Sequence, residues 1–379
     1  MNILTLMLTD SCNCQCVYCY QRVLKSNSVG NWKINQIEKL KDILLNIDAI
    51  HFFGGEPLLE EEFIINLDKY INDLFKKKKL FQKPIYIFSS NLTYLSKKFK
   101  KFLIKLKKEE HAFKFIISID GKKEIHDINR KISENLSSYE LILENNKFLQ
   151  ENNIELDSIV SVYNKKHLEN NCSILQTVFD ITKNFPNTKF VQFNYEECIS
   201  GLSIEKNLFF KTQLSAIEEV FQMIVNKETR VIHYKHFLRK FLNDIYFSLC
   251  HIQLKDYMCL NKKNKIAIFP NGDVYTCVDE YYLKVPPFKN INISSDKKAE
   301  LILKGSNCSS CKYDVICHIC PIKQDEYQEE CERKKEFFRI FEKNLKEIFS
   351  NVKTTYFFKK YLDISAITLK ELYLYFREI

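Results

Sequence analysis

Apolar and β-branched residues gather in six short runs along the first half of the chain, separated by amphipathic stretches. The stretches Ile34–Asn46, Glu60–Lys79 and Tyr139–Asn152 repeat apolar positions every three to four residues. This is the period of a helix with one buried face. The short runs predict six strands, at Ile3–Leu8, Ala49–Phe53, Pro84–Ser89, Lys114–Ile119, Leu156–Val162 and Lys189–Asn194.

Strict alternation of strand and helix predicts an α/β fold, with a parallel sheet and helices on its outside. Six units rather than eight indicate a partial (β/α)6 barrel, similar to a TIM barrel but open along one side. In such barrels the chemistry gathers at the carboxyl ends of the strands. Loops that follow strands are therefore where functional residues are expected.

The pattern changes in the second half of the chain. Residues 1–207 form the predicted barrel, and residues 208–256 have the pattern of a helical bridge. A cysteine-rich part with short strands and loops follows at residues 257–335. C-terminal helices are predicted at residues 336–379. The lysine- and aromatic-rich stretch Glu332–Ile379 has the pattern of two helices, and the spacing of Phe338, Phe341 and Leu345 is ordinary core packing.

The composition of the 379-residue chain is that of a globular protein, with 30 Phe, 20 Tyr and only seven each of Gly and Pro. Its formal net charge of +9 is spread over lysine-rich helical patterns, and no aromatic-basic motif favours nucleic acid. We find no run long enough to cross a membrane and no secretory signal. Fourteen cysteines in such a chain predict metal ligation in a reducing cytoplasm rather than disulfides.

Three cysteines lie close together in the loop after the first strand. Cys12, Cys16 and Cys19 have the spacing C-x3-C-x2-C, and Tyr18 precedes the last of them. Three thiolates can hold three irons of a four-iron cluster and leave the fourth iron open, whereas a closed cluster or a zinc site takes four ligands. The alternative is three buried structural thiols.

This spacing resembles that of the radical S-adenosylmethionine (radical SAM) enzymes. The resemblance implies that the open iron of a 4Fe-4S cluster binds the amino and carboxylate groups of SAM. Reductive cleavage of SAM would then give a 5′-deoxyadenosyl radical that removes hydrogen from an unactivated carbon. An external reductant such as flavodoxin or ferredoxin is implied as the electron source.

Two further motifs match the same family. Gly54, Gly55 and Glu56, followed by Pro57, end the second strand. They resemble the family motif that receives the amino group of SAM. Glycines suit that role because they let the backbone approach a ligand closely. The second motif, S-I-D-G-x4-H-D-x2-R, runs from Ser118 to Arg130. It is similar to the subgroup of the family that modifies proteins and peptides.

The resemblance assigns roles to single residues of these motifs. Ser118 would contact the ribose of SAM, and Arg130 offers a planar fork for its carboxylate. Asp120 could also address the ribose, and the alternatives for Asp120 and His126 are a helix cap and a surface histidine. Two more SAM contacts are expected, from Asn91 on the ribose side and from the backbone of Tyr18 to adenine.

A second set of seven cysteines lies in the cysteine-rich part, with the pattern C-x12-G-x4-C, then C-x2-C-x5-C-x2-C, then x10-C. It resembles the SPASM domain, which carries two auxiliary 4Fe-4S clusters in maturases of peptides and sulfatases. A zinc ribbon built on the two C-x2-C pairs is the competing interpretation, but it would leave the other cysteines idle. Resemblance assigns one cluster to Cys308, Cys311, Cys317 and Cys331 and the other to Cys259, Cys277 and Cys320.

The second cluster then has only three ligands from this set. Either Cys250 is the eighth ligand, or one iron stays open.

Auxiliary clusters can accept an electron from a substrate radical, which suits net oxidation. An electron carrier or an inactive scaffold would need no SAM-binding motifs, so the sequence favours an enzyme.

Two substrates fit these motifs. The first is a ribosomally made precursor peptide that receives a thioether or carbon–carbon crosslink, and the second is a sulfatase whose Cys or Ser becomes formylglycine. In sulfatase maturases an aspartate that acts as base usually follows the cysteine at the position of Cys277. Here that residue is Val278, and the nearest candidate acids are Asp279 and Glu280. We therefore favour the peptide. Because strand one begins at the third residue, we expect leader recognition by the barrel, the C-terminal helices or a separate leader-binding protein.

Overall fold

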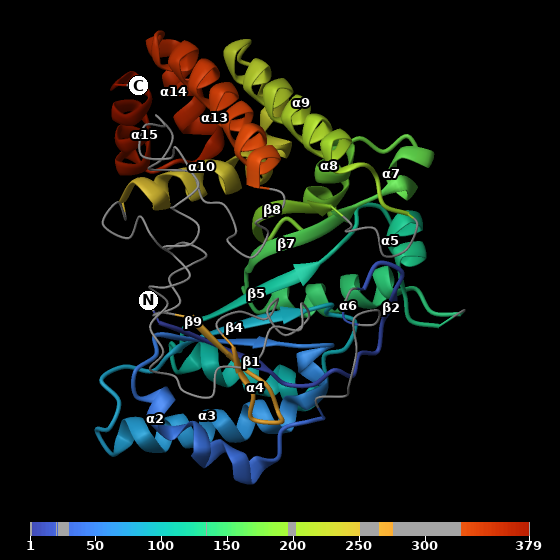
Figure 1. The fold of residues 1–379 in the computed structure, drawn as a ribbon, viewed down its shortest axis with the longest axis vertical. Helices are drawn as coiled ribbons and strands as arrows, with labels where there is room; N and C mark the ends of the chain where they lie inside the picture. The colour runs from blue at the N-terminus through green and yellow to red at the C-terminus, as the bar shows by residue number, and fades with distance from the viewer. Residues whose placement is uncertain are drawn as a thin grey trace.

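The computed structural model of the chain describes residues 2–19, 21, 30–133, 135–195, 202–250, 265–275 and 327–378. Six parallel strands form the centre of the molecule (Figure 1), and each predicted strand is present to within one residue at either end. These strands are β1 (Ile3–Met7), β3 (Ala49–Phe53), β4 (Ile85–Ser90), β5 (Phe113–Ser118), β7 (Leu156–Tyr163) and β8 (Thr188–Tyr195).

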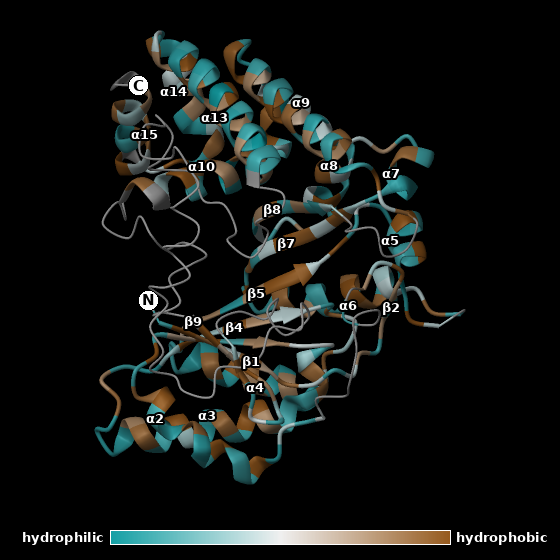
Figure 2. Ribbon diagram, viewed as in Figure 1, coloured by the Kyte–Doolittle hydropathy of each residue, from teal (hydrophilic) through white to brown (hydrophobic). Residues whose placement is uncertain are grey.

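The six strands lie side by side in the order β1-β3-β4-β5-β7-β8, and every neighbouring pair is parallel. Their carboxyl ends therefore meet at one edge, as predicted. Figure 2 shows the strands as mainly hydrophobic ribbons and the helices as two-faced ones, which is the pattern of a sheet covered by amphipathic helices.

Helices and short turns connect these strands. The barrel elements are η1 (Ile34–Leu40), α2 (Lys41–Leu44), η2 (Pro57–Glu60), α3 (Glu61–Lys76), α4 (Lys97–Lys108), α5 (Lys123–Asn129), α6 (Ser138–Glu151), α7 (Lys165–Glu169) and α8 (Ile174–Asn184). A two-stranded sheet joins β2 (Gln15–Cys16) to β6 (Arg130–Lys131). In the part of the chain that the structure describes, no helix is both long and apolar enough to cross a bilayer.

Two short strands from the cysteine-rich part extend the barrel sheet beyond β1. β9 (Lys265–Ile268) pairs parallel with β1, and β10 (Val274–Tyr275) pairs antiparallel with β9. An apolar cluster of Met7, Ala267, Phe269 and Tyr275 joins these strands to the barrel. The pairing satisfies backbone groups that would otherwise lie open at the edge of β1. Short strands were predicted in this part, but their pairing with β1 was not.

The C-terminal region has three helices where two were predicted. A second helix starts after the first because the Asn351 side chain accepts hydrogen bonds from two backbone N–H groups of its first turn. It ends at Leu362, and the capping residue Asp363 has a left-handed conformation. The three helices are α13 (Tyr327–Phe349), α14 (Val352–Leu362) and α15 (Ala366–Glu378).

These helices pack with the predicted helical bridge, which consists of α9 (Lys206–Val225), η3 (Thr229–His233) and α10 (Lys235–Cys250). Aromatic rings join them, with centroids 5.2 Å apart for Phe221 and Phe341 and 5.4 Å apart for Phe241 and Phe337. The bridge and the C-terminal helices thus form one helical cluster, at the top of Figure 1.

Candidate functional site

The cysteine loop follows β1 at the carboxyl edge of the sheet, as the sequence predicted. Its short strand β2 pairs with β6, which places Cys16 directly opposite Arg130. A further hydrogen bond runs from the Val17 N–H to the Asn129 carbonyl oxygen, at 2.9 Å. The loop is thus tied to the end of the S-I-D-G-x4-H-D-x2-R motif, more than a hundred residues away in sequence.

The two glycines after β3 pack directly against the same loop. A Cβ atom on Gly54 would lie 2.4 Å from the Thr9 carbonyl oxygen, and one on Gly55 would lie 2.1 Å from that of Ser11. The Gly55 N–H also donates to the Thr9 carbonyl oxygen, at 2.8 Å. Close approach was the expected use of these glycines, but here the backbone that needs the space belongs to the cysteine loop.

The Glu56 side chain is fully buried and joins three elements. Its Oε1 accepts from the Leu58 N–H at 3.1 Å and from the Ser90 hydroxyl at 2.8 Å, and its Oε2 accepts from the Asn91 N–H at 2.7 Å. Burial raises the pKa of Glu56 to about 7, although the three donors favour the charged form. Glu56 therefore couples the Gly-Gly turn to the turn that follows β4.

The three predicted cluster ligands are more exposed than Cys14, a fourth cysteine on the same loop. Cys12 is exposed and Cys16 and Cys19 are half-buried, which argues against the alternative of buried structural thiols. Cys14 is buried, and hydrogen bonds to its neighbouring cysteines together with burial raise its pKa. Cys14 also lies outside the C-x3-C-x2-C spacing, so we expect it not to be part of the ligand set.

The three thiols share one loop at the carboxyl edge of the sheet. Within the described residues, no three His, Cys, Asp or Glu side chains converge as they would around a single metal ion. Three cysteines that each bind a different iron can hold a four-iron cluster. Cys12, Cys16 and Cys19, with the predicted C-x3-C-x2-C spacing, are the residues that could hold one.

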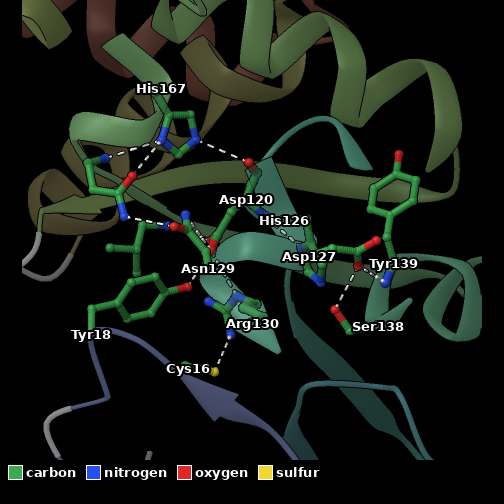
Figure 3. Close-up of polar contacts among 12 residues, drawn as sticks. Cys16, Tyr18, Asp120, His126, Asp127, Asn129, Arg130, Ser138, Tyr139 and His167 are labelled. Carbon is green, nitrogen blue, oxygen red and sulfur yellow. Dashed lines mark hydrogen bonds and ion pairs between the residues drawn. The ribbon is translucent and has the colours of Figure 1, made fainter. Parts of the chain in front are cut away.

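Asp120 is the centre of a buried polar network beside the cysteine loop (Figure 3). Its fully buried carboxylate accepts from Arg130 Nε at 3.1 Å, from the Val162 N–H at 3.0 Å and from Asn129 Nδ2 at 3.3 Å. Tyr18 donates its hydroxyl to the same carboxylate. Burial is the largest single effect on the pKa of Asp120 and raises it, but the charge of Arg130 together with the hydrogen bonds from Tyr18 and the Val162 N–H outweighs burial, so the pKa is lowered.

This network corrects the interpretation of Asp120 as a helix cap, because α5 begins after Lys122. The Asp120 carboxylate accepts four hydrogen bonds and holds Arg130 and Tyr18 in place. Contact of Asp120 with a ribose stays a prediction.

Arg130 lies between this network and the cysteine loop. Its Nη1 is 4.0 Å from Cys16 Sγ, and its guanidinium carbon is 5.3 Å from the centroid of the Tyr18 ring. Together with a hydrogen bond from Cys14, the charge of Arg130 lowers the pKa of Cys16 to about 7 despite burial. A thiolate at Cys16 is the form that binds iron.

Two histidines hold the backbone of Asp120. His126 Nδ1 accepts from the Asp120 N–H at 3.2 Å, and His167 Nε2 donates to the Asp120 carbonyl oxygen at 3.1 Å. Burial lowers the pKa of His126 to about 4, so the ring is neutral. The interpretation of His126 as a surface histidine is wrong, since its side chain is fully buried. His167 carries no motif, and no sequence signal could have identified it.

Several predicted site residues stay predictions. Ser118 is the last residue of β5 and is partly exposed at the carboxyl edge. Asn91 follows β4, and its side chain contacts the cysteine loop. Cys331 is on α13, and Cys250 is the last residue of α10. The remaining predicted ligands and acids lie outside the described residues: Cys259, Cys277, Cys308, Cys311, Cys317, Cys320, Asp279 and Glu280.

Comparison with known proteins agrees with this site. The model of the Radical SAM superfamily matches residues 6–173, which contain the cysteine loop and both SAM motifs. An uncharacterized protein of Methanocaldococcus jannaschii is 28% identical over 76% of this chain and 93% of its own length. The cysteine-type anaerobic sulfatase-maturating enzyme of Clostridium novyi is 26% identical over 82% of this chain and 83% of its own.

Solved structures show the same fold. Native anSMEcpe with bound AdoMet covers 91% of this chain and 98% of its own, with a TM-score of 0.65 and 22% identity. Streptococcus suis SuiB bound to precursor peptide SuiA covers 83% of this chain and 70% of its own, with a TM-score of 0.55 and 13% identity. Residues 6–173 of this chain thus match the Radical SAM superfamily, and the chain as a whole is similar to cysteine-type anaerobic sulfatase-maturating enzymes, which indicates that it is an enzyme.

Proposed function

We propose that this enzyme uses SAM to oxidise a side chain of a ribosomally made precursor peptide. The observation that carries the radical chemistry is the position of Arg130, which Asp120 holds beside Cys16. A fixed guanidinium next to an iron-ligating loop is suited to the carboxylate of a SAM molecule chelated by the same cluster. When bound, the cluster supplies the electron that cleaves SAM to methionine and a 5′-deoxyadenosyl radical.

The residues around that position supply the rest of a SAM site. Ser118 faces the ribose in this proposal, and the backbone of Tyr18 faces the adenine. Carbonyl groups of the turn at Gly54 and Gly55 accept from the amino group. Because Asp120 neutralises the buried Arg130, the guanidinium keeps its orientation before SAM arrives, which reduces the entropy lost on binding.

A peptide substrate is supported by the two kinds of relative. One group is named for maturation of sulfatases, and SuiB is bound to a precursor peptide. Removal of a hydrogen atom from such a peptide leaves one further electron and one proton to be lost in a net oxidation. Auxiliary clusters held by the second cysteine set are proposed to accept that electron, and flavodoxin or ferredoxin is proposed to reduce the first cluster.

Formylglycine formation in a sulfatase is the second candidate. Two observations favour it: the sequence similarity to the Clostridium novyi enzyme, and the larger TM-score with anSMEcpe than with SuiB. Against it, Val278 occupies the position of the expected base. Asp279 or Glu280 would have to take that role from a neighbouring position.

The test separates the two substrates by mass. The anaerobically reconstituted enzyme, SAM and dithionite are incubated with a peptide encoded beside its gene, and in parallel with a synthetic cysteine-containing sulfatase peptide. We expect the adjacent peptide to lose a pair of hydrogen atoms for each bond formed. Conversion of the sulfatase peptide alone, with the mass of formylglycine, would overturn the first proposal in favour of the second.

A further inference from the structure

The turn after β4 has a strained backbone that several side chains hold in place. Leu92 is fully buried and has φ of 55°, a left-handed conformation that usually costs a non-glycine residue about 1–3 kcal/mol. Its N–H donates to the Ser90 hydroxyl at 2.8 Å, and its carbonyl oxygen accepts from Asn145 Nδ2 at 3.0 Å. Glu56 holds the N–H of Asn91 in the same turn. Strain that is maintained in this way indicates a functional requirement at the turn.

The turn fixes the side chain of Asn91 against the cysteine loop. Asn91 Oδ1 accepts from the Thr93 N–H at 2.9 Å and from the Thr93 hydroxyl at 2.6 Å. Both donors face the oxygen, so the orientation of the amide is determined, and Nδ2 must face the loop. There Nδ2 lies 2.9 Å from Asn13 Oδ1 and 3.6 Å from Cys12 Sγ.

Three side chains close this arrangement into a ring of hydrogen bonds. Asn91 donates to Asn13, Asn13 Nδ2 donates to the Thr93 hydroxyl at 2.8 Å, and that hydroxyl donates to Asn91. Asn91 and Thr93 are buried, and donors in a closed ring polarise one another. Cys12 Sγ also accepts from the Cys14 N–H, at 3.4 Å. Two N–H groups therefore point at the sulfur of one predicted iron ligand.

We propose that Asn91 is a positioning residue that donates an N–H to the Cys12 thiolate and raises the reduction potential of the cluster that this cysteine binds. Reduction adds negative charge to the cluster and its sulfurs, and a fixed N–H donor stabilises the reduced form more than the oxidised form. The inference rests on the proposed function, since it requires the cluster at the cysteine loop. It adds a role for Asn91 that differs from contact with the ribose.

The test is a redox titration of the reconstituted Asn91→Ala variant and of wild type. The cluster at the cysteine loop is monitored through the electron paramagnetic resonance signal that changes when SAM is added. We expect the equilibrium constant for one-electron reduction to fall about tenfold, which is about 59 mV toward lower potential. Thr93→Val, which removes the hydroxyl that orients the amide, should shift the potential in the same direction by a smaller amount. It also serves as the second variant if Asn91→Ala fails to fold.

The matched control is Asn145→Ala. Asn145 is as buried as Asn91 and holds the same turn through the Leu92 carbonyl oxygen, but it does not contact the sulfur. We expect it to lower stability and leave the potential unchanged. An unchanged potential in both test variants, or an equal shift in the control, would overturn the role of Asn91. Failure of the proposed function is separate, because it would appear as a wild-type signal that does not respond to SAM.

Discussion

Replacement of Asp120 by Asn tests the buried network beside the cysteine loop. Arg130 is 7% exposed, and Asp120 is the carboxylate that pairs with it. Asparagine can still accept from the Val162 N–H, but its amide nitrogen would face the donors of Arg130 and Asn129. Loss of one partner of a buried ion pair leaves the other charge uncompensated, at a cost of about 3–5 kcal/mol. We expect Asp120→Asn to lower the free energy of unfolding by that amount.

The assay is urea unfolding of the purified protein, followed by circular dichroism at constant pH and ionic strength. Asp127→Asn is the matched control, since Asp127 belongs to the same motif but its hydrogen bonds within the described residues come from neutral donors: the hydroxyls of Ser137 and Ser138 and the Tyr139 N–H. It should cost about 1–3 kcal/mol. If Asp120→Asn were no more destabilising than Asp127→Asn, the ion pair would not be the organising contact of the site.

Two further predictions concern the Gly-Gly-Glu turn. Gly55→Ala should displace the cysteine loop and sharply reduce the amount of iron bound on reconstitution. The control is Gly30→Ala: Gly30 has a positive φ for an alanine to strain, but no atom lies within 4 Å of the new Cβ, so the iron content should stay at the wild-type level. Equal iron contents in the two variants would contradict the packing argument. Because the pKa of Glu56 is raised from 4.5 to about 7, the folded state holds its proton more tightly. The contribution of Glu56 to stability should therefore be greatest below pH 4.5 and fall by about 3 kcal/mol as the pH rises to about 7. Urea unfolding across that range should show the fall in wild type and a flat contribution in Glu56→Gln; the same slope in both proteins would exclude Glu56 as its source.

The strands and the cysteine loop could be predicted because their signals are local. Each strand is a short β-rich run between helical patterns, and all six were located to within one residue. The pairing of β9 with β1 joins residues about 260 positions apart. No local pattern contains that information, because register between distant strands depends on tertiary packing.

The site was predictable in its residue types and less so in their contacts. The sequence placed Asp120 and Arg130 in one motif but could not show that they pair with each other. Nor could the sequence show the left-handed conformation of Leu92, because large apolar residues usually have φ below zero. Asn145, Ser90 and Glu56 help to hold this turn, and these contacts exist only in the folded chain.

The most direct test of the central claim is the yield of 5′-deoxyadenosine from SAM in oxygen-free, dithionite-reduced protein. Wild type and Cys14→Ala should both form 5′-deoxyadenosine, because Cys14 is a buried neighbour outside the ligand set. Cys16→Ala should form none, because it removes a ligand that Arg130 adjoins. No 5′-deoxyadenosine from wild-type protein with a full iron content, or an equal yield from Cys16→Ala, would contradict a SAM-cleaving cluster at this loop.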